Sequence, residues 1–124
     1  MELKFYKCKH CGNVATKITD KGVKLSCCGE EMKELIAGTT DGAREKHVPA
    51  YVVNGSEVSV VIGEVIHPMI EAHYIEWIGI ETTKGFYFKN LNPNDEPKAV
   101  FELTTDEKLV AVYEYCNLHG LWKA

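Results

Sequence analysis

The distribution of cysteines is the feature that most constrains how this chain can fold. Four of its five cysteines, Cys8, Cys11, Cys27 and Cys28, lie near the start, and Cys116 lies near the end. A module shorter than about 40 residues rarely stays folded without a metal, disulfides or a partner. An odd cysteine count fits a disulfide framework poorly, and clustered cysteines in a reducing compartment are usually metal ligands. We therefore predict a metal-stapled module over residues 1–37 and a separate domain over residues 38–124.

The first cysteine pair forms a C-x-x-C knuckle closed by Gly12, and the second pair is directly adjacent in sequence. A zinc ribbon would normally repeat the C-x-x-C spacing. Four thiolates can still complete one site, and their softness allows either zinc or iron. The spacing thus predicts a metal without choosing it, and a purely structural zinc stays open. We expect His10, between the two knuckle cysteines, to point outward.

The rest of the chain has the pattern of short strands. We expect strands at 3–6 and 23–25, and then in the segments 48–53, 58–62, 75–80, 86–88, 99–103 and 109–115. Turn signals such as Asn54-Gly55 and Lys84-Gly85 separate several of them. No stretch has a convincing helical period. Strands of this length and spacing predict an all-β chain with an antiparallel β-sandwich after the small module.

A second constellation of candidate ligands lies in the sandwich domain. It consists of His47, His67, His73, His119 and Cys116. Each of these residues has an ordinary explanation by itself, such as a surface histidine or a buried core thiol. Histidine is nevertheless the commonest metal ligand. The joint occurrence favours a metal site, although the sequence does not show that the five residues meet.

Composition excludes several other classes of function. The net charge is −4, whereas a nucleic-acid binder normally carries a basic patch. No apolar run approaches the roughly 20 residues that span a bilayer. The first residues lack the apolar segment of a secretory signal. We therefore expect no nucleic-acid partner, no membrane association and a cytoplasmic location.

Taken together, the motifs resemble desulfoferrodoxin, the two-iron superoxide reductase family. The resemblance spans essentially the whole chain, with no departure at an expected ligand position. It is carried by the four cysteines, by the segment from Thr40 to Pro49 that contains Glu45-Lys46-His47, by His67-Pro68-Met69, by His73-Tyr74-Ile75-Glu76-Trp77, and by Cys116-Asn117-Leu118-His119-Gly120.

The resemblance implies a fold and an activity. The first module would be desulforedoxin-like, with one iron held by its four cysteines. The second would be an immunoglobulin-like β-sandwich, with an iron held by His47, His67, His73 and His119 in one plane and by Cys116 on the axis. The implied reaction is the one-electron reduction of superoxide to hydrogen peroxide, which serves detoxification in an anaerobe or microaerophile.

The resemblance also implies roles for two further residues and for partners. Glu45 looks like the carboxylate that binds the iron after oxidation, and Lys46 like the residue that attracts superoxide. Family members usually take electrons from rubredoxin and are typically homodimers, with the small module at the dimer contact. Whether the first iron relays electrons or only holds the module together stays open.

Two rival interpretations come from other classes of protein. A zinc-ribbon interaction module fused to a β-sandwich explains the first four cysteines but leaves the histidines and Cys116 without a role. A simple electron-transfer protein, with both irons closed to substrate, does not explain why Glu45 and Lys46 precede a ligand histidine.

Overall fold

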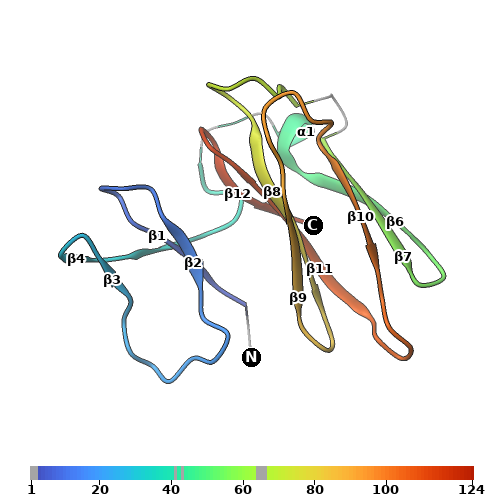
Figure 1. The fold of residues 1–124 in the computed structure, drawn as a ribbon, viewed down its shortest axis with the longest axis horizontal. Coiled ribbons are helices and arrows are strands. Elements are labelled where there is room, and N and C mark those ends of the chain that lie inside the picture. The colour runs from blue at the N-terminus through green and yellow to red at the C-terminus, as the bar shows by residue number, and fades with distance from the viewer. Residues whose placement is uncertain (1–2, 41, 43, 64–66) are drawn as a thin grey trace. The chain divides into compact units, whose positions relative to one another are not determined.

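The computed structural model describes residues 3–40, 42, 44–63 and 67–124, with the side chains of residues 44 and 45 left out. The chain divides into two compact units, Met1–Ile36 and Ala37–Ala124. Strands dominate both units (Figure 1), which confirms the predicted all-β class. Among the described residues, no helix has the length and apolar character needed to cross a membrane.

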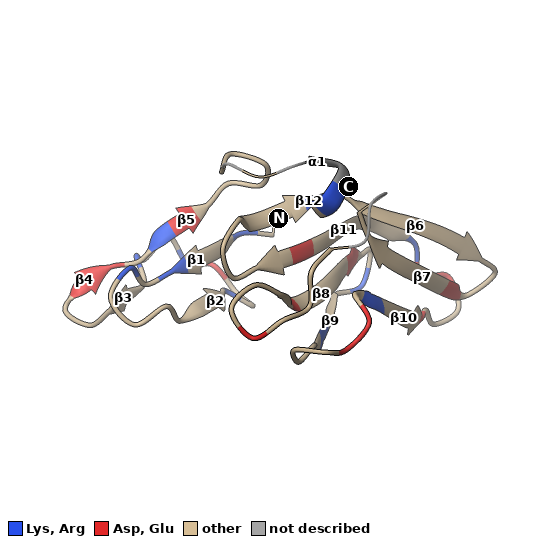
Figure 2. Cartoon of the chain, turned by 90° about the horizontal axis from the view of Figure 1, so that it is seen from above, with Lys and Arg blue, Asp and Glu red and all other residues tan. Residues whose placement is uncertain are grey.

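The N-terminal unit contains five short strands. They are β1 (Phe5–Lys7), β2 (Val14–Thr16), β3 (Ser26–Cys27), β4 (Glu30–Glu31) and β5 (Lys33–Leu35). β1 pairs with β2 and β5, and β3 pairs with β4, all antiparallel. The strand predicted at 23–25 is wrong, because β3 begins at Ser26, after a single backbone hydrogen bond from Met32 to the Leu25 carbonyl. Acidic residues occupy β4 (Figure 2).

The apolar core of this unit is very small. Among its described residues, the buried apolar side chains are Phe5, Cys8 and Met32. Three side chains cannot offset the conformational entropy that more than thirty ordered residues lose. The unit therefore needs a further source of stability, which its cysteines can supply.

The C-terminal unit consists of two facing sheets. In one sheet the strands follow the order β10 (Lys98–Glu102), β7 (Glu57–Ile62) and β6 (Pro49–Asn54). In the other they follow the order β12 (Gly120–Lys123), β11 (Leu109–Cys116), β8 (Ile75–Thr82) and β9 (Phe86–Asn90). A one-turn helix, α1 (Arg44–His47), precedes β6. The sequence did not predict this helix, since four residues are too few to carry a helical period.

Alternating side chains from both sheets form one core. β7 contributes Val58, Val60 and Ile62, while polar or exposed residues alternate with them on the other face. β8 and β11 contribute apolar side chains from the opposite sheet, including Val112 and Cys116. This is the packing of a β-sandwich.

A β-bulge lies at one end of the core. Tyr115 pairs with Trp77 and Cys116 pairs with Ile75, so β8 has one extra residue, Glu76, at this point. The extra residue lets both Ile75 and Ile78 face the core. Bulges commonly re-aim side chains beside functional sites, and this one directs the chain toward the turn that contains His73.

A hydrogen-bonded carboxylate, Glu107, lies near the ends of β8 and β11 that are farthest from the bulge. Glu107 is buried and accepts hydrogen bonds from the hydroxyl of Thr82, the Tyr87 hydroxyl at 2.6 Å and the backbone N–H of Thr104 at 2.9 Å. These bonds, led by the one from Thr82, lower the pKa of Glu107 from 4.5 to about 2.

Candidate metal centres

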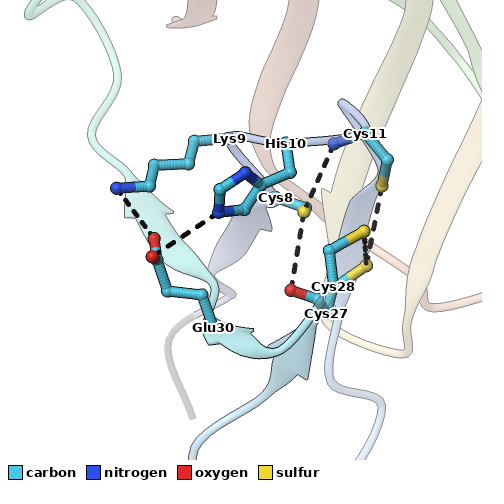
Figure 3. Close-up of polar contacts among 7 residues, drawn as sticks. All are labelled: Cys8, Lys9, His10, Cys11, Cys27, Cys28 and Glu30. Atoms are coloured by element: carbon cyan, nitrogen blue, oxygen red, sulfur yellow. Dashed lines mark hydrogen bonds and ion pairs between the residues drawn. The ribbon is translucent and has the colours of Figure 1, made fainter.

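The four N-terminal cysteines converge on one point (Figure 3). Their sulfur atoms all lie within 4.8 Å of one another. The Sγ atoms of Cys11 and Cys27 are 3.6 Å apart, and those of Cys27 and Cys28 are 4.0 Å apart. Tetrahedral coordination with metal–sulfur bonds of about 2.3 Å requires sulfur separations of about 3.8 Å. The sulfur positions therefore fit a single tetrahedral ion.

Two local backbone features produce this geometry. In the knuckle, the backbone N–H groups of Cys11 and Asn13 point at the sulfurs of Cys8 and Cys11, each at 3.5 Å. Adjacent residues of an extended strand point to opposite sides. Cys28 departs from this rule because its φ of 54° is left-handed, followed by Gly29 at 75°. That turn lets adjacent cysteines serve one site.

The pKa values show why these sulfurs need a cation. The N–H of Cys11 helps lower the pKa of Cys8 to about 6. The pKa of Cys28 is instead raised to about 12, first by its sulfur neighbour Cys11. Four sulfurs this close cannot all ionise without a compensating positive charge, which a bound metal ion supplies.

Glu30 on β4 connects the two halves of the site. Its carboxylate lies 2.8 Å from the Lys9 ammonium and 3.5 Å from Nε2 of His10. Figure 3 shows both side chains reaching from the knuckle to Glu30. His10 is thus directed at a carboxylate.

In the C-terminal unit, four imidazoles form a ring. Successive ring centroids are 4.6 Å apart for His47–His67, 4.7 Å for His67–His73, 5.0 Å for His73–His119 and 4.9 Å for His119–His47. Each of these neighbouring pairs is edge-on, whereas His47 and His73 face each other across 6.4 Å at 27°. The four rings thus occupy the corners of a rough square.

The nitrogen atoms of this ring fit a cation. Nε2 of His67 lies 3.0 Å from Nε2 of His47. Two neighbouring ligands with metal–nitrogen bonds of about 2.1 Å at a right angle are about 3.0 Å apart. Nδ1 of His67 lies 2.7 Å from the Pro68 carbonyl. Since a carbonyl only accepts, Nδ1 carries the proton and Nε2 offers its lone pair to the centre.

Burial favours the neutral form of two of these rings, His67 and His73. His47 and His67 are each 1% exposed. Burial lowers the pKa of His67 to about 4 and also lowers that of His73. Nε2 of His73 is buried and has no hydrogen-bond partner among the described residues. A buried nitrogen lone pair without a partner is costly unless a cation binds it.

Cys116 completes the set from the end of β11. It is fully buried, and its sulfur lies within 4.8 Å of ligand nitrogens from His47, His67 and His73. Burial raises its pKa, while the backbone N–H groups of His119 and Leu118 oppose that shift. His119 contributes to the square of rings but is not a member of this tighter set.

Trp122 and Thr40 support His119, a role that the sequence analysis did not assign to either residue. The Trp122 indole stacks on His47 at 5.0 Å and donates to the His119 carbonyl at 3.0 Å. The Thr40 hydroxyl donates to the same carbonyl. A Cβ added at Gly42 would lie 3.2 Å from His119, so this glycine permits close packing. Trp122 is only three residues from His119, whereas Thr40 and Gly42 are more distant in sequence and reach it only through the fold.

The two candidate catalytic residues lie on α1. The side chain of Glu45 falls outside the described residues. Lys46 is half-buried, and its charge helps to lower the pKa of His73, for which burial is the largest cause. The ammonium of Lys46 therefore acts electrostatically on the ligand ring.

The donor sets suggest what each centre can hold. Four thiolates in a tetrahedron suit zinc or iron. Imidazoles with a thiolate suit a redox-active transition metal, and the thiolate affects its electronics. The chain thus combines one centre typical of structural or electron-transfer sites with one suited to redox chemistry.

Comparisons with known proteins agree with this arrangement. The family model described as desulfoferrodoxin matches residues 39–124, and that for the desulfoferrodoxin N-terminal domain matches residues 1–35. Desulfoferrodoxin of Nitratidesulfovibrio vulgaris is 46% identical over 99% of this chain and 96% of its own. Superoxide reductase of Thermococcus kodakarensis is 34% identical over 67% of this chain and 87% of its own.

A solved structure is similar along the whole chain. The superoxide reductase from Treponema pallidum superposes with a TM-score of 0.84 at 37% identity, covering 100% of this chain and 99% of that one. The resemblance noted in the sequence is confirmed. The chain belongs to the desulfoferrodoxin family.

Proposed function

We propose that this chain is a superoxide reductase that reduces superoxide to hydrogen peroxide at the centre ringed by four histidines. The observation that carries the proposal is the square of four imidazoles beside the buried thiol of Cys116. Relatives and structural neighbours named superoxide reductase support it. Ferrous iron, when bound there, supplies the single electron that, with two protons, converts superoxide to hydrogen peroxide.

The chain's own residues set the charge of this centre. Four neutral imidazoles add no charge, and the Cys116 thiolate adds one negative charge. The ligand set therefore leaves a divalent cation with one uncompensated positive charge, which attracts an anionic substrate. The net charge of the whole chain, −4, opposes this attraction at long range. Lys46, whose charge already acts on His73, counters that opposition locally.

Glu45 is proposed as the carboxylate that binds the iron once it is oxidised. An oxidised centre has one more positive charge, so an anionic ligand binds it more strongly. The place of Glu45 in α1, directly before Lys46 and His47, supports this role. On binding, the carboxylate would help to displace the product.

Cys8, Cys11, Cys27 and Cys28 are proposed to hold a second iron. Their sulfur spacing fits one tetrahedral ion, and the small core of their unit favours stabilisation by a bound ion. Cys11→Ser tests whether this iron also relays electrons. Slower re-reduction of the histidine-ringed centre would indicate a relay. Normal turnover with weaker dimer association would indicate a structural role. A rubredoxin-like donor, a homodimer and a cytoplasmic location complete the proposal.

Metal analysis and product stoichiometry test the function. The purified protein should contain two irons per chain, and its oxidised form should show a thiolate charge-transfer band. With a reductant present, each superoxide consumed should yield one hydrogen peroxide and no dioxygen. His73→Ala should abolish this activity and that band, while the spectrum of the four-cysteine centre stays unchanged. A colourless zinc protein, or release of dioxygen as in dismutation, would contradict the proposal.

A further inference from the structure

We propose that Asn117 is a positioning residue that fixes the His73 turn against the Cys116 loop and so sets the geometry of the metal centre. The inference rests on the proposed function only in taking these residues as iron ligands. Asn117 lies directly after Cys116 and two residues before His119. It contacts the residues on both sides of His73.

Three hydrogen bonds join these two segments. The backbone N–H of Asn117 donates to the Tyr74 carbonyl at 3.2 Å. The side-chain Oδ1 accepts from the Tyr74 N–H at 3.0 Å, and Nδ2 donates to the Ala72 carbonyl at 3.1 Å. Each amide atom has only one suitable partner type, since an N–H must donate and a carbonyl must accept. The orientation of the amide is thereby determined.

The side chain of Asn117 extends the strand ladder past its last regular pair. β11 and β8 pair as far as Cys116 and Ile75, just beyond the bulge. Residues 72–74 then leave the sheet, and the Asn117 amide replaces the backbone groups that a further strand residue would offer. An amide on a short side chain offers an acceptor and a donor on two separate atoms, whereas leucine offers neither and an ionised aspartate offers only acceptors.

The other side of the His73 turn is also held. Ile70 and His73 exchange two backbone hydrogen bonds, at 3.1 and 2.9 Å. Asn117 closes the turn from the opposite direction, so the backbone of His73 is held on both sides. Without the amide, the turn would keep its internal hydrogen bonds, but its position relative to Cys116 would be less well fixed. The distance between a ligand nitrogen and the thiolate would then vary.

The test compares Asn117→Ala and Asn117→Asp with the parent, using the iron-loaded full chain. Removing an outer-shell partner of a metal ligand typically weakens metal binding 10- to 100-fold. Asn117→Ala should thus release the histidine-bound iron to a chelator at least about tenfold faster and shift the thiolate charge-transfer band. Asn117→Asp keeps the acceptor for Tyr74 but places an oxygen against the Ala72 carbonyl, so its effect should be intermediate. The Tyr74 amide should exchange with solvent faster in Asn117→Ala, which loses its acceptor, than in Asn117→Asp, which keeps it.

Two internal references make the result decisive. The four-cysteine iron in the same molecule should keep its spectrum and release rate, and Asn54→Ala, at the far end of β6, should behave like the parent. Iron release and a band equal to the parent's in Asn117→Ala would overturn the inference, even if the variant melts at a lower temperature. If Asn117→Ala does not fold, an Asn117→Asp protein with an unaltered band and release rate overturns it equally. A parent that binds both irons without reducing superoxide would refute the proposed function and leave this inference standing.

Discussion

The carbonyl of His119 offers a sharp test, because two donors from separate segments share it. The Trp122 indole N–H donates to this oxygen at 3.0 Å, and the Thr40 hydroxyl donates to it as well. Trp122→Phe removes one donor but keeps an aromatic ring to stack on His47. Thr40→Val removes the other donor with little change of shape. Together the variants form a double-mutant cycle around one acceptor.

The expected magnitudes follow from the shared acceptor. Each single change removes one hydrogen bond but leaves the oxygen bonded, at a cost of about 0.5–1.5 kcal/mol. The double variant removes both of these donors from a partly buried carbonyl, and loss of the second donor should cost more than loss of the first, because leaving a polar group unsatisfied costs about 1–3 kcal/mol. The double variant should therefore exceed the sum of the single changes by about 1 kcal/mol. That coupling corresponds to about a fivefold factor in an equilibrium or rate constant.

The assays are urea unfolding followed by far-ultraviolet circular dichroism and the rate of iron release to a chelator. Both should show the excess in the double variant, since His119 lies in the ligand ring. A control cycle pairs Thr40→Val with Trp77→Phe, whose indole stacks instead on Tyr115. The control costs should add. Additive costs in the first cycle as well would refute the view that the two donors jointly hold His119.

Three further predictions concern other parts of the chain. Lys46→Met should slow the encounter with superoxide by a few-fold at low ionic strength and weaken its salt dependence, as measured by pulse radiolysis; an unchanged rate would exclude steering. Gly79→Ala should destabilise the fold by about 1–3 kcal/mol in urea titrations, because its Cβ would lie 2.6 Å from the Phe86 ring. Gly85→Ala, which meets only an ordinary contact at 3.7 Å, should change stability by less than about 0.5 kcal/mol, and equal costs would contradict the packing. Glu107 has a pKa lowered from 4.5 to about 2, led by the threonine hydroxyl bond, so it stabilises the fold above pH 4.5 and loses that effect as the pH falls toward 2. The melting-temperature gap between parent and Glu107→Gln should narrow across that window, and a constant gap would contradict this assignment.

Local patterns in the sequence determined the fold class and the candidate ligands. The alternation of Val58, Val60 and Ile62 with outward residues sets one strand, because side chains alternate faces along an extended backbone. The cysteine knuckle is likewise local, since its turn brings Cys8 and Cys11 together within four residues. The strand expected at 23–25 was wrong because a short segment with two apolar residues does not reveal where its pairing partners lie.

Only the tertiary structure decided which distant residues meet. The sequence named His47, His67, His73 and His119 as candidates, but the ring they form depends on α1, a loop and two strand ends arriving at one place. The bulge at Glu76 and the hydrogen bonds from Asn117 to the His73 turn depend on the register of β8 against β11, which no local pattern encodes. Ligand types are a property of single residues, and the sequence therefore identifies them. Ligand geometry is a property of packing between segments, and only the folded chain defines it.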